Sequence, residues 1–283
     1  MLFRSRYAIG MWPWELPEWP QFWQHAYGFV DEIWAASRFT YDAYCRSAPI
    51  PVRHMPMAVT VDATEGAIRS DFGLMGERFL FAFAFDGLST FARKNPEACI
   101  NAFQRAFPER NDPVGMVIKG LRVDGSPAWD RLSAQIGDDP RITIITESLS
   151  RGKLLDLYRA IDCFVSLHRS EGFGRNIAEA MLLEKPVIVT AHSGNMDFTG
   201  PDTAALVPVR LVQLGKGDYP FGAGQMWAEA DVKAAAGFMQ RMRTDCAWRQ
   251  GIAHAGRLRL EQFYSPYAVG NRWQEVLHSL AVN

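Results

Sequence analysis

Hydrophobic residues along the middle of the chain gather in short runs separated by longer stretches with a helical period. The runs predict strands, because buried parallel strands are apolar on both faces. The expected strands are Phe79–Phe85, Val114–Lys119, Arg141–Thr146, Cys163–Leu167 and Pro186–Thr190. The expected helices between them are Pro96–Phe107, Pro127–Ile136, Arg151–Ile161 and Arg175–Leu183. This alternation predicts an α/β fold with a Rossmann-like, doubly wound parallel sheet.

The two ends of the chain have different patterns. Residues 1–54 hold five of the nine tryptophans, and the pattern from about Trp19 to Cys45 predicts helices. Three prolines in the segment Ser47–Asp62 predict an extended connector. After about residue 225 the pattern is helical to the end. We therefore divide the chain into a mostly helical segment 1–54, a Rossmann-like domain 55–265 and a C-terminal helix 266–283.

Composition narrows the class of protein. The net charge is −1 over 283 residues, which argues against nucleic acid as a partner. The four cysteines are widely spaced and form no C-x-x-C pair, so we expect reduced thiols and no zinc site. The longest clean apolar run, Phe79–Phe85, is too short to cross a bilayer. With no signal peptide visible at the start, we expect a cytoplasmic protein.

The segment Ser166–Met181, SLHRSEGFGRNIAEAM, carries the sharpest chemical signal. It follows an expected strand and opens an expected helix, where α/β sheets bind ligands. Gly172 and Gly174 let a ligand approach the backbone, and the helix N-terminus suits a phosphate. Glu179, eight residues after Glu171, could accept hydrogen bonds from a diol such as ribose. Two glycines alone are more typical of an ordinary β-α turn, with Glu179 on a solvated helix face, than of a ligand site.

The whole string resembles the retaining glycosyltransferases of family 4 (group 1). These enzymes have the GT-B fold of two facing Rossmann-like domains and carry an E-x7-E motif. Further similar segments are Arg93-Lys94-Asn95-Pro96, Ile100–Phe103, Lys185–Ile188 and Ser193–Phe198. The resemblance covers roughly residues 55–275.

The resemblance implies roles for particular residues. Glu179 would hold the ribose of a UDP- or GDP-sugar, and Glu171, with the backbone of Gly172, Phe173 and Gly174, would face the donor sugar. Lys94 would stabilise the departing diphosphate, and Leu149 matches the region that meets the base. Glu171 and Lys94 would therefore be the catalytic pair. No metal or other cofactor is expected. The alternative for Lys94 is an exposed lysine at a helix start.

Three positions leave alternatives open. Relatives often carry an arginine where this chain reads Phe85-Asp86-Gly87-Leu88-Ser89, and Arg93 or Ser89 could replace it at the diphosphate. His168 is either a general base or a buried histidine that shapes the site. Asn195 and Asp197 are expected at the rim.

The first 54 residues are short for the acceptor domain of the GT-B fold. The segments Ile9–Pro17 and Asp31–Ser37 resemble that domain's last β-α units, and the final helix resembles the one that crosses back to it. We expect a truncated frame, a fragment or a form whose acceptor half comes from a partner chain. The tryptophan cluster is either an acceptor- or membrane-facing platform or the core of an incomplete domain.

Three functions remain from this reading. The first is a hexosyltransferase acting on a carbohydrate or lipid-linked acceptor in polysaccharide or glycoconjugate synthesis, free in the cytoplasm or peripheral at the inner membrane face. The second is a non-catalytic nucleotide-sugar-binding subunit that needs a separate acceptor domain. The third, a nucleotide-sugar epimerase or dehydrogenase, ranks low because Asp86–Phe91 lacks the G-x-G-x-x-G turn.

Overall fold

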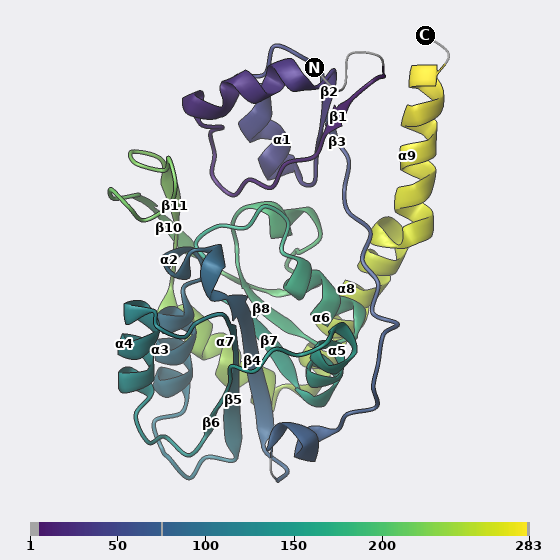
Figure 1. The fold of residues 1–283 in the computed structure, drawn as a ribbon. Helices are drawn as coiled ribbons and strands as arrows, with labels where there is room; N and C mark the ends of the chain where they lie inside the picture. Colours follow the sequence, from purple (N-terminus) through teal and green to yellow (C-terminus); the bar gives the residue numbers. More distant parts are fainter. Residues whose placement is uncertain (1–5, 75, 282–283) are drawn as a thin grey trace.

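A six-stranded parallel sheet forms the centre of the larger domain in the computed structural model, which describes residues 6–74 and 76–281 (Figure 1). Its order is β6-β5-β4-β7-β8-β9, and every neighbouring pair is parallel. The strands are β4 Phe79–Asp86, β5 Val114–Leu121, β6 Ile142–Ile145, β7 Cys163–Ser166, β8 Val187–Thr190 and β9 Ala205–Val207. The predicted Rossmann-like fold is confirmed.

Helices cover both faces of this sheet, as the sequence of β4 requires. Phe81 and Phe83 belong to one buried cluster, with helices α3, α4 and α7, whereas Leu80 and Ala82 belong to another, with α5 and α6. The helices are α2 Phe91–Lys94, α3 Pro96–Ala106, α4 Pro127–Ile136, α5 Arg151–Ala160, α6 Arg175–Leu182, α7 Val232–Thr244 and α8 Cys246–Tyr264. Short 3-10 helices are η2 Arg69–Phe72, η3 Gly87–Ser89 and η4 Gly194–Asp197.

The N-terminal part is a small α/β unit above the carboxyl edge of the large sheet (Figure 1). Its parallel sheet has the order β1-β2-β3, and its helices are η1 and α1. The bounds are β1 Ile9–Gly10, η1 Gln21–Phe29, β2 Glu32–Ala35, α1 Arg38–Cys45 and β3 Val52–His54. The helical prediction for 19–45 missed β2, and the connector prediction missed β3, because these strands have only four and three residues.

The segment after residue 207 also contains more strand than predicted. Strands β10 Val209–Gln213 and β11 Met226–Ala230 form an antiparallel pair, so the purely helical prediction after 225 was wrong at its start. The final helix, α9 Pro266–Ala281, rises beside the N-terminal unit (Figure 1). The rings of Trp273 and Trp34 lie 5.2 Å apart, and Arg272 Nη2 donates to the carbonyl of His54 at 2.6 Å. The chain therefore ends by crossing back to its first unit.

Candidate donor-binding site

The predicted site residues meet at the carboxyl ends of β4 and β7. After β4 the chain forms η3 and α2, which carries Arg93 and Lys94, and after β7 it forms the turn that leads into α6. Arg169, just after β7, fixes α2 in place. Its backbone N–H donates to the carbonyl of Arg93 at 2.8 Å, and its Nη1 donates to the carbonyl of Ala92 at 2.5 Å. These two hydrogen bonds hold the segment after β7 against helix α2, although the two are far apart in the sequence.

Glu171 lies between two cations. Lys94 Nζ donates to Glu171 Oε1, and Arg93 Nη1 lies 3.3 Å from Oε2. Burial alone would raise the pKa of Glu171, but Lys94 and Arg93 outweigh it and lower the pKa to about 2. Arg93 also donates to the carbonyl of Ser170 at 2.8 Å. Glu171 is therefore a buried carboxylate that stays ionised at neutral pH, and Lys94 is not the exposed lysine of the alternative interpretation.

Glu179 is buried in a different way. Its residue is fully buried on α6, and neither carboxylate oxygen has a hydrogen-bond partner among the described residues. Arg151 Nη1, from the first turn of α5, lies 2.8 Å from Oε1 as an ion pair without hydrogen-bond geometry. Burial raises the pKa of Glu179, and Arg151 opposes that rise. A buried carboxylate with free acceptors has the chemistry needed to take two hydroxyl donors.

The glycine turn before α6 packs closely against the N-terminal unit. A Cβ on Gly172 would come within 2.5 Å of the carbonyl oxygen of Trp14, and Gly174 has a φ of +95°. Ser37 Oγ donates to the carbonyl of Gly172 at 2.6 Å. The turn is thus the place where the N-terminal unit touches the donor side, and Gly172 is required there by close approach.

His168 is a buried structural residue. Its Nδ1 contacts Ser166 Oγ at 3.0 Å, and its Nε2 contacts Asn195 Oδ1 at 3.0 Å. Burial lowers the pKa of His168 to about 4. The ring is therefore neutral near pH 7 and occupied on both nitrogens, which favours the shaping role over the general base.

The predicted rim residues also have structural partners. Asn195 Nδ2 donates to the carbonyl of Thr190 at 3.0 Å. Asp197 accepts from the backbone N–H of Arg38 at 2.9 Å. Both residues therefore fix the loop after β8 rather than point at the Glu171 cluster.

The remaining predicted residues lie around the cluster. The Phe173 ring packs against Phe198 and Tyr264, and the residue also lines the cavity of about 300 Å³. Ser89 ends η3 and makes no side-chain hydrogen bond to the described residues. Leu149 lies one residue before Ser150, the N-cap of α5, and packs on the same core as α6.

Sequence reasoning missed two residues of the site. Arg151 pairs with Glu179, and Glu15 Oε1 lies 3.6 Å from Arg93 Nη2. The position of Arg151 right after an N-cap serine, in the helix next to the expected base region, was the one available signal. Glu15 comes from the N-terminal unit, so its place follows only from how the two parts meet.

Two cavities adjoin these residues. A cavity of about 110 Å³ is lined by Lys94, Glu171, Gly174 and the start of α6. A cavity of about 300 Å³ lies between the glycine turn and the N-terminal segment, with Trp12, Trp14 and Glu15 on its wall. The tryptophans are mainly core, since Trp14, Trp19 and Trp34 are buried and pack with their neighbours. Trp12, Trp14 and Trp34 of this tryptophan cluster also line the cavity of about 300 Å³.

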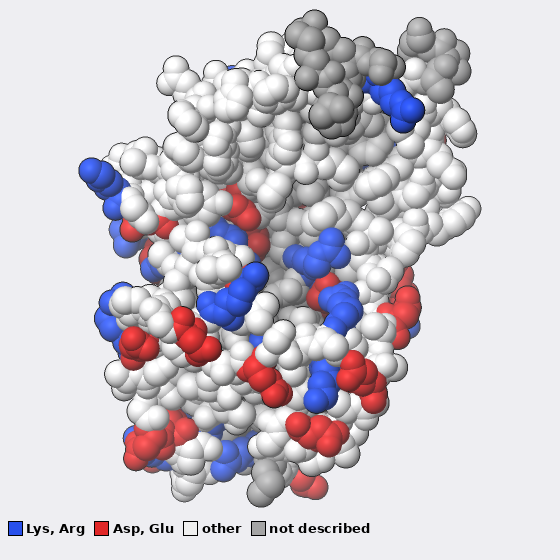
Figure 2. All heavy atoms as spheres, in the orientation of Figure 1, with Lys and Arg blue, Asp and Glu red and all other residues white. Residues whose placement is uncertain are grey.

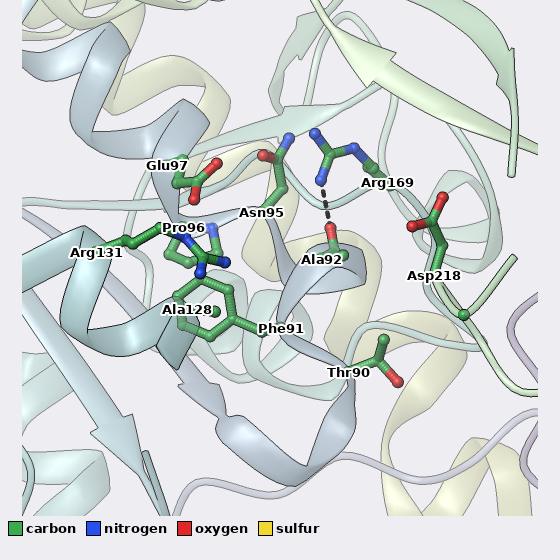
Figure 3. Close-up of a pocket in the computed structure, with 11 residues that line it drawn as sticks. Thr90, Phe91, Ala92, Asn95, Pro96, Glu97, Ala128, Arg131, Arg169 and Asp218 are labelled. Atoms are coloured by element: carbon green, nitrogen blue, oxygen red, sulfur yellow. Dashed lines mark hydrogen bonds between the residues drawn. The ribbon is translucent and has the colours of Figure 1, made fainter. Parts of the chain in front are cut away.

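A third cavity, of about 420 Å³, lies beyond α2 (Figure 3). Arg131 and Arg169 face it together with Glu97 and Asp218. These charges balance, and Arg169 is already paired with Glu229, with its Nε 2.8 Å from Oε2. Since Lys94, Glu171 and Glu179 do not line this cavity, it is separate from the candidate donor site.

Charge is distributed unevenly over the face shown in Figure 2. Lysine, arginine, aspartate and glutamate gather over the larger domain, whereas the N-terminal unit is almost entirely uncharged on this side. Within residues 6–74 and 76–281, no group of three or more His, Cys, Asp or Glu is placed to hold a metal ion. In the same ranges, every helix is too short or too polar to cross a membrane.

The fold and site define this protein as a Rossmann-like α/β protein of the GT-B kind. Residues 89–210 match the family described as "Glycosyl transferases group 1". The match contains Lys94, Glu171 and Glu179. The resemblance predicted from the sequence is confirmed. No curated protein sequence matches the chain.

Solved structures show the same fold. A glycosyltransferase from Rickettsia africae superposes with a TM-score of 0.75 at 14% identity, over 97% of this chain and 71% of its own. HepE from Anabaena, solved with UDP and glucose, gives 0.73 at 17% identity, over 97% and 72%. The pneumococcal O-GlcNAc transferase GtfA, solved with UDP and GlcNAc, gives 0.69 at 12% identity, over 99% and 53%. The chain therefore spans between about half and three quarters of these proteins.

Proposed function

We propose that this chain binds a UDP- or GDP-sugar and acts in a retaining hexosyl transfer to a carbohydrate or lipid-linked acceptor, in polysaccharide or glycoconjugate synthesis. The observation that carries the proposal is Glu179. It is a fully buried carboxylate whose oxygens accept no hydrogen bond from the described residues, and Arg151 is paired with Oε1 alone. It lies in α6, the helix that follows the glycine turn. A ribose diol would supply the two missing hydrogen bonds.

The diphosphate would lie at the Arg93–Lys94 corner. Lys94 and Gly174 line the same small cavity at the N-terminus of α6, where free backbone N–H groups favour an anion. When the bond between the sugar and the diphosphate breaks, negative charge grows on the leaving oxygen. Lys94 and the helix terminus would stabilise that charge in place of a metal. Arg93 would remain with Glu171 and keep that carboxylate ionised.

Glu171 would orient the donor sugar. Its carboxylate already has two cationic partners, and its pKa of about 2 keeps it a hydrogen-bond acceptor across the neutral range. The cavity of about 300 Å³ shares Glu171 and the glycine turn with the donor site, and we propose that an acceptor held there reacts on the face of the sugar from which the diphosphate leaves. We infer retention from that arrangement, with Glu171 positioning hydroxyls rather than forming a covalent intermediate.

The alternative is a non-catalytic nucleotide-sugar-binding subunit whose acceptor half comes from another chain. Its structural support is the cavity of about 300 Å³ beside the glycine turn, because its wall carries Trp12 and Trp14 and an apolar wall can be covered by another chain. In that case the aromatic cavity wall would be completed by the partner. Placement in the cytoplasm, free or at the inner membrane face, belongs to the same proposal.

Donor turnover separates the two proposals. We would measure sugar release from UDP-glucose and GDP-mannose by the wild-type chain, by Glu171→Gln and by Glu184→Gln. Glu184 is an exposed surface carboxylate paired with His254 and Arg257, so it is the matched control. The enzyme proposal predicts turnover that falls about a hundredfold in Glu171→Gln only. Nucleotide binding without turnover would instead support the subunit.

A further inference from the structure

A cavity of about 410 Å³ lies at the junction of the two domains, apart from the donor site. Its wall comes from α1, the end of β3, η4, α8 and α9, and it includes none of Lys94, Glu171 or Glu179. It is thus built where the N-terminal unit, the larger domain and the crossing helix meet. The size falls within the range of small-molecule sites, about 300–1,000 Å³.

Three arginines line this cavity: Arg38, Arg259 and Arg272. A guanidinium carries five N–H donors, and few of these donors are used. Arg272 donates to the carbonyl of His54 at 2.6 Å, and Arg259 to the carbonyl of Asp197 at 3.3 Å. The guanidinium of Arg38 forms no hydrogen bond or ion pair with the described residues.

Among the described residues on the wall, Asp197 is the one acidic residue, and its carboxylate already has partners within the protein. Its Oδ2 accepts from the backbone N–H of Arg38 at 2.9 Å and lies 3.0 Å from His54 Nε2. Nδ1 of His54 is buried and has no hydrogen-bond partner among the described residues. The cavity wall therefore carries three arginines and one carboxylate that has other partners.

We propose that this cavity binds a phosphate group, carried either by a phospholipid or by a soluble phosphate monoester. A phosphate has about two charges and three acceptor oxygens, which match the planar N–H pairs of several arginines better than a single carboxylate does. The exposed ring of Phe263 on the rim, with the guanidinium of Arg259 5.7 Å from its centroid, is compatible with either carrier. This inference does not depend on the donor-site proposal.

The test uses the full chain and two probes, inorganic phosphate by calorimetry and vesicles by co-sedimentation. The vesicles contain phosphatidylcholine with phosphatidic acid, against pure phosphatidylcholine. The test variants are Arg259→Gln/Arg272→Gln and Arg38→Gln. The second removes no side-chain hydrogen bond or ion pair to the described residues, so we expect it to fold. The control Arg241→Gln/Arg257→Gln makes the same charge change at exposed pairs on α7 and α8.

Phosphate binding that weakens about tenfold or more in both test variants, but not in the control, supports the soluble carrier. Loss of vesicle binding in the same variants, with phosphate silent, supports the lipid headgroup. Repeating the titration with saturating UDP separates the sites, because phosphate at the donor site would be displaced. The proposal is overturned if neither probe binds the wild-type chain, or if the control loses as much affinity as the test variants.

Discussion

Two buried carboxylates on the same turn and helix have opposite environments. Glu171 is held by Lys94 and Arg93, and its pKa falls to about 2, whereas burial raises the pKa of Glu179. Neighbouring acidic groups whose pKa values are shifted in opposite directions are typical of functional sites. The sequence spacing located both residues, but it could not reveal Arg151 and Glu15. Their contacts with Glu179 and Arg93 join segments far apart in the chain, and spacing carries information only within one helix or turn.

Replacement of Lys94 tests the first environment. Lys94→Met leaves Glu171 buried with Arg93 alone, so we expect its pKa to rise and the free energy of unfolding at pH 7 to fall by up to about 3 kcal/mol. Urea unfolding measures this. Arg110→Met, which breaks an exposed pair with Asp138, should cost less than about 1 kcal/mol. Equal losses in the two variants would show that Lys94 and Glu171 are not a buried pair.

His168 gives a prediction on pH. The folded state holds the ring neutral with a pKa of about 4, against an ordinary value of 6.5, so acid favours the unfolded chain. Its contribution to stability is complete above pH 6.5 and is lost as pH falls toward 4. Between pH 7 and pH 5 the wild-type chain should lose about 2 kcal/mol that a His168→Gln variant does not lose. If the free energy of unfolding fell equally with pH in the wild type and in His168→Gln, the ionisation of His168 would not be the cause.

Sequence patterns predicted some elements much better than others. The long buried strand β4 and helix α4 were found within one residue, because each is apolar in its own period over at least eight positions. The hairpin strand β10 is half exposed along its length and gave no such pattern. Strands β1 to β3 have two to four residues each, too few to show a period. Their pairing depends on contacts across the N-terminal unit.

The glycine turn can be tested as an element. A Gly172→Ala variant would push a methyl group to within 2.5 Å of the Trp14 carbonyl oxygen, so we expect a loss of about 1–3 kcal/mol in thermal or urea unfolding. Gly237 lies inside α7 with nothing within 4 Å of its added Cβ. Gly237→Ala should therefore stabilise the protein by about 0.5–1 kcal/mol. A tolerated Gly172→Ala would mean that the turn and the N-terminal segment are not in contact.

At the scale of the whole molecule, helix α9 ties the first unit to the last. Trp273 packs on Trp34, which is only 4% exposed. In a Trp273→Ala variant, amide hydrogen exchange should rise in β2 and β3, while β4 and β5 in the large sheet should stay protected. Leu277→Ala, at a 44% exposed position on the same helix, is the control. Unchanged exchange in β2 would show that α9 does not support the N-terminal sheet.

The central claim is that a nucleotide binds at Glu179, and calorimetric titration with UDP and GDP tests it most directly. The titration uses the wild-type chain, Glu179→Ala and the surface control Glu184→Ala, without metal. We predict that one nucleotide binds the wild type and the control and that its affinity falls about a hundredfold in Glu179→Ala, because two charge-assisted hydrogen bonds are lost. Binding of neither nucleotide by the folded chain, or equal binding by Glu179→Ala, would contradict the account.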